Sequence, residues 1–219
     1  MLKYCDSFAA FDAVIFDMDG VLIDSERIWQ TRQPDFILQL FPDFPTETSH
    51  QFAGRTAKGV FEILSPYNIQ NISEESFLER FREFGSREIY SEVTAFEGVE
   101  ELLQRLHKNP EISLALGSSS LIQWVKMAME KTGFEKYFSA ICSAEEIGGV
   151  SKPAPDIFLY AAKKLGVAPE KCLVIEDANA GVQAAKAAGM TVWAFRNGVN
   201  HQQDLSKADH IFSSFKTLL

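Results

Sequence analysis

The chain has little cysteine, a deficit of positive charge and no long hydrophobic run. Its three cysteines, Cys5, Cys142 and Cys172, lie far apart, and no two have the spacing of a metal-binding or redox pair. They are expected to be reduced core thiols. Residues 1–11 lack a signal-peptide pattern, and no apolar run approaches the ~20 residues that span a bilayer. The sequence therefore predicts a cytoplasmic protein without a membrane partner.

The charge balance limits the possible partners further. Acidic residues outnumber lysine and arginine by 30 to 21, which gives a formal net charge of −9. Such a chain repels nucleic acid, so no nucleic-acid partner is expected, and an anionic small substrate would need a few well-placed cations. With 219 residues, 46% of them hydrophobic, the chain can form one large domain with a smaller insertion. We expect a monomer or a weak dimer.

A short apolar run that ends in two acids is the central feature of the sequence. Residues 13–16 are followed directly by Asp17, Met18, Asp19 and Gly20. Two carboxylates this close in a partly buried place stay ionised only beside a cation or strong hydrogen-bond donors. An ordinary Asp-Gly turn after a strand is the alternative. The favoured interpretation is a bound cation at the end of a buried strand.

The hydrophobic pattern changes along the chain. Between residues 25 and 91 it predicts only helices, the first over about 25–41, where Pro34 should kink or interrupt it. Beyond residue 95 it predicts helices that alternate with strands at 112–116, 140–142, 172–175, 191–195 and 211–212. This pattern is typical of a Rossmann-like α/β fold, a parallel sheet in a three-layer α/β/α core. Residues 1–22 and 96–219 would form the core, and residues 23–95 an inserted helical domain.

Polar residues follow the predicted strands where the carboxyl ends of a parallel sheet form a ligand crevice. The groups are Asp17 and Asp19, Ser118 to Ser120, Glu176 and Asp177, and Lys152 in a proline-bounded loop. Each has an ordinary explanation as a helix cap or a surface residue. Together they supply acids for a divalent cation, donors for an anion and one ammonium group. That set fits phosphoryl transfer.

These motifs, in this order, resemble those of the haloacid dehalogenase-like hydrolase superfamily across nearly the whole chain. Asp17-Met18-Asp19-Gly20-Val21 is similar to the first motif, and Ser118 to the second. Lys152 in Ser-Lys-Pro is similar to the third, and Glu176-Asp177 to the fourth. The inserted helices resemble the small helical cap of subfamily I, the branch that holds sugar-phosphate phosphatases and β-phosphoglucomutase.

The resemblance implies catalytic and substrate-binding roles. Asp17 would be the nucleophile that forms an aspartyl-phosphate, and Asp19 the general acid and then the general base. Ser118 and the neighbouring N–H groups, including that of Ser119, would bind phosphate oxygens. Lys152 would neutralise both Asp17 and the transferred group. Arg55 matches a basic cap position that contacts substrate in similar proteins.

The resemblance also implies Mg²⁺ as the cofactor. The Asp17 carboxylate, the Asp19 backbone carbonyl and Asp177 would hold the ion, and Glu176 would orient them from outside. An acid at position 19 favours phosphate esters over dehalogenation. Trp29 stands where the mutase-like members carry a histidine, which favours a phosphatase similar to those for deoxyhexose phosphates.

We therefore expect a Mg²⁺-dependent phosphoric monoester hydrolase acting on small phosphorylated metabolites such as hexose or deoxyhexose phosphates. The cap would close over the site by hinges near residues 22–25 and 91–97. One alternative is a β-phosphoglucomutase-like phosphohexomutase, which hands the phosphoryl group to a sugar hydroxyl instead of water. The other is a non-catalytic binding protein of the same fold.

Overall fold

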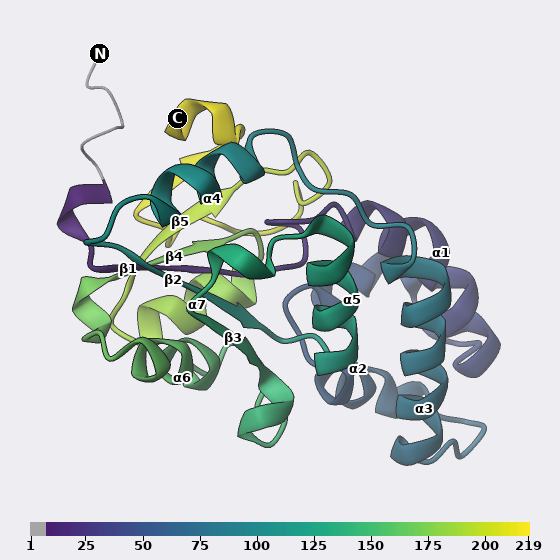
Figure 1. The fold of residues 1–219 in the computed structure, drawn as a ribbon. Helices are drawn as coiled ribbons and strands as arrows, with labels where there is room; N and C mark the ends of the chain where they lie inside the picture. The colour runs from purple at the N-terminus through teal and green to yellow at the C-terminus, as the bar shows by residue number, and fades with distance from the viewer. Residues whose placement is uncertain (1–7) are drawn as a thin grey trace.

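A six-stranded parallel sheet forms the centre of the computed structural model, which describes residues 8–219 (Figure 1). The strands, in the order β3-β2-β1-β4-β5-β6 across the sheet, are all parallel to their neighbours. Their bounds are β1 Ala13–Phe16, β2 Ser113–Ser118, β3 Ala140–Ser143, β4 Cys172–Glu176, β5 Thr191–Phe195 and β6 His210–Phe212. The predicted three-layer α/β fold is confirmed. The strand that precedes Asp17 lies in the middle of the sheet.

Helices cover both faces of the sheet because successive strand side chains point to opposite faces. Val14 and Phe16 of β1 belong to one apolar cluster, and Ala13 and Ile15 to the other. The helices of this part are α4 Val99–His107, α5 Ile122–Thr132, α6 Asp156–Leu165 and α7 Asn179–Ala187. Short 3-10 segments occupy Glu135–Tyr137, Ala144–Ile147, Pro169–Lys171 and Phe215–Leu218.

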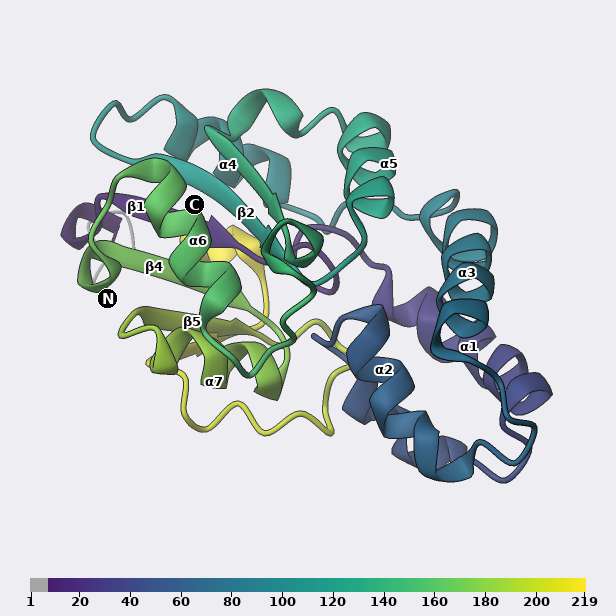
Figure 2. The same cartoon turned by 90° about the horizontal axis from the view of Figure 1, so that it is seen from below.

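The segment between β1 and α4 is helical, as the sequence predicts. Residues 25–91, all within the described part, contain α1 Glu26–Leu40, α2 Ala57–Leu64, α3 Glu74–Phe84 and a π-helical turn, Gly85–Tyr90. Two 3-10 segments, Thr46–Phe52 and Ser65–Tyr67, complete it. Figures 1 and 2 both show these helices beside the sheet and its covering helices, not stacked on them.

Helix α1 differs from the expectation in one respect. It runs through Pro34 without interruption. Residues on both sides of the proline, among them Trp29 and Ile37, are buried. Their packing outweighs the backbone hydrogen bond that proline cannot donate.

The two connections into and out of the helical segment lie side by side. The Asp24 N–H donates to the Thr94 carbonyl at 2.9 Å, and the Phe96 N–H donates to the Leu22 carbonyl at 3.1 Å. Ile23 and Ala95 form an isolated antiparallel bridge between these hydrogen bonds. The chain therefore leaves the sheet and returns to it at one place.

The described cysteines are core residues. Cys142 and Cys172 are free and buried, and burial raises the pKa of each thiol to about 11. Such thiols are poor nucleophiles at neutral pH. Cys5 and the start of the chain lie outside the described residues. Within residues 8–219, the helices are too short or too polar to cross a bilayer.

Candidate active site

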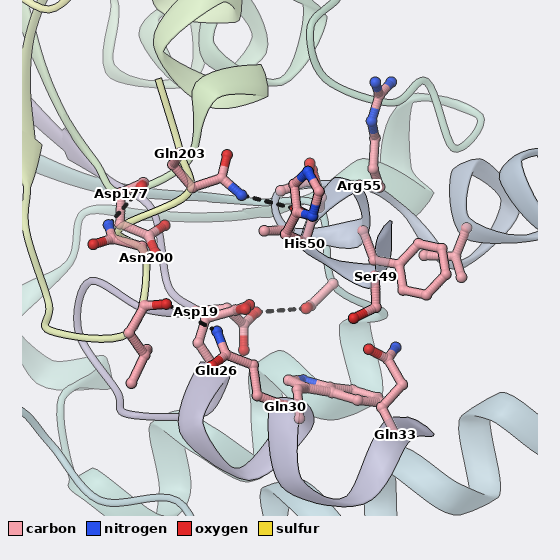
Figure 3. A pocket seen from close by; sticks show the side chains of 18 of the residues that line it. Asp19, Glu26, Gln30, Gln33, Ser49, His50, Arg55, Asp177, Asn200 and Gln203 are labelled. Carbon is pink, nitrogen blue, oxygen red and sulfur yellow. Dashed lines mark hydrogen bonds between the residues drawn. The ribbon is translucent and has the colours of Figure 1, made fainter. Parts of the chain in front are cut away.

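Three neighbouring strands bring the predicted site residues to one edge of the sheet. Phe16 at the end of β1 lies between Leu116 of β2 and Ile175 of β4. The residues that follow these strands therefore emerge at the same level. A cavity of about 430 Å³ opens there, lined by Asp17, Asp19 and Asp177 and by residues of the helical segment 26–90. Figure 3 shows Asp19 and Asp177 with residues of that segment around the cavity.

Lys152 lies fully buried beneath Asp17, where it bridges two carboxylates. Its Nζ donates to Asp17 Oδ1 and to Glu176 Oε1, each at 2.7 Å, and lies 4.7 Å from the centre of the Phe158 ring. Burial alone lowers the pKa of a lysine, but the two carboxylates outweigh it and raise the pKa of Lys152 above its usual value. Lys152 therefore stays charged and fixes one oxygen of Asp17.

Glu176 serves as the structural counterpart of Lys152. Its second oxygen accepts the backbone N–H groups of Asp177 and Ala178 at 2.7 and 2.8 Å, so both of its oxygens are engaged. Gly181 of α7 packs so closely that a Cβ there would lie 1.7 Å from Glu176 Oε1. This close contact explains a glycine inside the helix.

Asp17, Glu176 and Asp177 form a buried acidic cluster that suits a cation. One carboxylate oxygen from each lies within 4.8 Å of the others. Asp17 Oδ2 and Asp177 Oδ1 accept no hydrogen bond from any residue of the described chain. Burial raises the pKa of Asp17 to about 7 and that of Asp177 well above its usual value, with neighbouring acids adding to both shifts. Two free hard oxygens and this unfavourable charge fit a divalent metal ion.

Two asparagines that the sequence analysis missed hold Asp177 in place. Asn197 Nδ2 donates to Asp177 Oδ2 at 2.8 Å and to the Gly20 carbonyl at 3.0 Å. Asn200 Nδ2 donates to the Asp177 carbonyl at 2.7 Å. Gly20 has φ +75°, and a Cβ there would lie 2.2 Å from Asp177 Oδ2. An Asn-rich turn after the strand that ends at Phe195 is the sequence signal that could have indicated these residues.

The Asp19 carboxylate points away from the acidic cluster toward hydroxyl groups. Ser25 and Tyr90 donate to its Oδ1 at 2.6 and 2.7 Å, and Ser120 donates to its Oδ2 at 2.6 Å. Burial raises the pKa of Asp19, and the three hydroxyls oppose that rise. Tyr90, at the end of the π-helical turn, thereby links the helical segment to this acid. No local pattern in the sequence indicates this contact of Tyr90.

The serine turn lies against the same cavity. Ser118 is fully buried at the end of β2, where its Oγ accepts the Ser120 N–H at 3.0 Å. Ser119 and Ser120 line the cavity, and Ser119 Oγ donates to the Gly54 carbonyl at 2.9 Å. The turn therefore touches both the sheet and the helical segment.

Two further residues reach the cavity from the helical segment. Arg55 lines it, and its Nη1 donates to the Lys152 carbonyl at 2.8 Å. Glu26, which the sequence analysis did not single out, lines it beside Asp19. Burial, followed by repulsion from Asp19, raises the pKa of Glu26 to about 8.

Comparison with known proteins identifies the family. The family model for haloacid dehalogenase-like hydrolase matches residues 14–195. The chain is 32% identical over 180 residues to the phosphorylated carbohydrates phosphatase of Thermotoga maritima, and the alignment covers 82% of each protein. A β-phosphoglucomutase structure from Clostridium difficile has a TM-score of 0.78 and 25% identity, covering 95% of this chain and 93% of that one. The chain therefore belongs to the haloacid dehalogenase-like hydrolase family.

A larger relative contains a related region. The chain is 36% identical over 194 residues to Protein SUPPRESSOR OF QUENCHING 1, chloroplastic, from Arabidopsis thaliana. This alignment covers 84% of the chain but 18% of that protein.

Within the family, the predicted enzyme class of phosphoric monoester hydrolase is confirmed by the phosphatases among the relatives.

Proposed function

We propose that the protein is a Mg²⁺-dependent phosphatase of phosphorylated carbohydrates, with hexose or deoxyhexose phosphates as substrates. The observation that carries this proposal is the arrangement around Asp17. One of its oxygens is fixed by Lys152, and the other is free at the base of a cavity beside Asp177. The name of the Thermotoga maritima relative supports carbohydrate esters as the substrate class.

In the proposed reaction, a carboxylate oxygen of Asp17 attacks phosphorus, and the bond from phosphorus to the sugar oxygen breaks. Asp19 gives its proton to that leaving oxygen. Water then attacks the phosphorus of the aspartyl-phosphate and passes a proton to Asp19. This second step breaks the bond between phosphorus and Asp17, so inorganic phosphate leaves and the Asp17 carboxylate is restored. Lys152 offsets the negative charge on Asp17 throughout.

The remaining roles follow from the same arrangement. Asp17, Asp177 and the Asp19 carbonyl would hold Mg²⁺, which would neutralise phosphate charge when bound. Glu176 would orient Lys152 and the turn of Asp177, since both of its oxygens are already engaged. Ser118 and Ser119, with the N–H groups of their turn, would bind phosphate oxygens.

We also propose that residues 1–22 and 96–219 form a catalytic core and that residues 23–95 form a cap. The paired connections at Asp24–Thr94 and Leu22–Phe96 are the natural place for hinges. Arg55 would follow the cap, and closure would bring its side chain and Tyr90 against the bound ester.

The test is phosphate release from a panel of sugar phosphates, measured with Mg²⁺ and with a chelator. Asp17→Asn keeps the shape of the side chain but removes the nucleophile, so we expect kcat to fall by at least ~10³-fold. Asp43→Asn, the same change at an exposed position, is the matched control. Release that survives in Asp17→Asn would refute the nucleophile assignment. Absence of release, with conversion of glucose 1-phosphate in the presence of a bisphosphate primer, would favour the mutase.

A further inference from the structure

One wall of the cavity carries a side-chain amide that faces the cavity and has no hydrogen-bond partner within residues 8–219. Gln33 of α1 is 7% exposed, and no residue of the described chain forms a hydrogen bond with its side chain. Figure 3 shows the amide directed into the cavity, toward the hydroxyl of Ser49. The Ser49 side chain likewise has no hydrogen bond within residues 8–219. Both side chains line the cavity and have no protein partner in the described chain, so they are available to a molecule that enters the cavity.

Two neighbouring amides, those of Gln30 and Gln203, differ from Gln33 because protein groups already occupy them. Gln30 Nε2 donates to the Val199 carbonyl at 3.1 Å, and Gln203 Nε2 donates to the His50 carbonyl at 2.7 Å. These two amides hold the cavity wall together. Gln33 and Ser49 differ from these two amides because their side chains have no such partner in the described chain.

The charges around the cavity disfavour a second anionic group. The acids that line it are Asp17, Asp19, Glu26, Glu47 and Asp177. Among the described lining residues, Arg55 is the one lysine or arginine; its Nη1 donates to the Lys152 carbonyl, and its buried Nε has no hydrogen-bond partner in the described chain. Two histidines, His50 and His201, complete the basic residues of the lining. One phosphate beside a metal ion can be accommodated, but the part of the cavity near Gln33 offers no dedicated cation.

Aromatic rings complete this part of the cavity. Trp29 stacks on Phe81 with ring centres 5.2 Å apart and lies 5.7 Å from Trp124, and all three line the cavity. An aromatic wall next to free hydrogen-bonding groups suits the carbon face and the hydroxyls of a sugar.

We propose that Gln33 and Ser49 form a hydroxyl-binding subsite that selects phosphate monoesters whose remaining part is neutral and polyhydroxylated. Esters that carry a second phosphate or a carboxylate are disfavoured. This inference rests on the proposed phosphatase activity and adds the chemical class that the cavity accepts.

The first experiment compares substrates with and without hydroxyls. The kcat/KM is measured for glucose 6-phosphate, mannose 6-phosphate and fructose 1-phosphate, and for p-nitrophenyl phosphate, which has none. Gln33→Leu should lower kcat/KM for the best hexose ester about tenfold more than for p-nitrophenyl phosphate. Gln39→Leu makes the same change at an exposed position of the same helix and should leave both values as in the wild type. Equal losses on the two substrates, or no loss, would overturn the subsite.

The second experiment introduces the missing charge. The wild type should hydrolyse fructose 1-phosphate at least about tenfold better than fructose 1,6-bisphosphate, and Gln33→Lys should narrow that ratio. A wild type that prefers the bisphosphate, or a ratio that Gln33→Lys leaves unchanged, would overturn the inference alone. Failure of the wild type to hydrolyse any ester, including p-nitrophenyl phosphate, would instead refute the proposed function.

Discussion

At the scale of single residues, the two carboxylates that we propose as nucleophile and general acid differ in their hydrogen-bond partners. Asp17 is held by an ammonium group, whereas Asp19 is held by three hydroxyls from Ser25, Tyr90 and Ser120. The charged partner of Asp17 favours its ionised state and opposes the rise in pKa that burial causes. Hydroxyl partners leave the other free to exchange a proton, because a hydroxyl can donate to a carboxylate or accept from a carboxylic acid.

Tyr90 provides a test of this division. Its hydroxyl lowers the pKa of Asp19, so Tyr90→Phe should raise that pKa further above its usual value. We expect kcat to fall about tenfold, and the limb of the kcat profile that Asp19 sets to move to higher pH. The measurement is kcat against pH with a saturating sugar phosphate. Tyr160→Phe, which removes a hydroxyl bonded to Glu146 instead, is the control. A profile that does not move would show that the Tyr90 hydroxyl does not act on Asp19.

At the scale of elements, the turn after β5 supports the acidic cluster. Asn197 bridges Asp177 and Gly20, so it ties the turn to the end of β1. Without a hydrogen-bond partner, the Asp177 side chain would rotate freely. The hydrogen bond from Asn197 therefore orients the Asp177 carboxylate.

Asn197→Ala should therefore weaken metal binding more than it weakens the fold. We expect the Mg²⁺ concentration for half-maximal activity to rise about 10–100-fold, because Asp177 loses the donor that fixes its orientation. The measurement is a Mg²⁺ titration of phosphate release, with circular dichroism as the check on folding. Asn109→Ala, in the turn after α4, is the matched control. An unchanged titration would contradict the orienting role of Asn197.

The strands and the acids at their ends could be predicted because buried parallel strands are short apolar runs, and a polar residue directly after one is unusual. The continuation of α1 through Pro34 could not be predicted, since it depends on the packing of Trp29 and Ile37. Tyr90 is 71 residues from Asp19 in the sequence, and Asn197 is 20 residues from Asp177. A local sequence pattern cannot predict contacts between residues so far apart.

At the scale of the whole molecule, the helical segment and the sheet share one apolar cluster. Trp124 belongs to α5, yet it stacks on Tyr90 with ring centres 5.0 Å apart and contacts Phe81 at 5.5 Å. The same cluster includes Phe16 of β1. The two parts are therefore coupled through side chains that neither could bury alone.

This coupling predicts a single unfolding transition. Trp124→Ala should lower the free energy of unfolding by about 3–5 kcal/mol, because it removes a large buried ring and leaves a cavity between the two parts. Urea denaturation followed by circular dichroism and by fluorescence should give coincident curves in the wild type. Two separate transitions in the wild type would show that the helical segment unfolds independently.

The contact between Trp29 and Trp124 also has a spectroscopic consequence. Trp29 lies in α1 of the helical segment and Trp124 lies in α5, with their ring centres 5.7 Å apart. The third tryptophan, Trp193, is buried on β5. Any rotation of the helical segment away from the sheet would separate the pair and admit water between the rings. In Trp193→Phe, all tryptophan fluorescence would then arise from Trp29 and Trp124. The indole pair would thus report any movement of the helical segment relative to the sheet by its own fluorescence, with no attached dye.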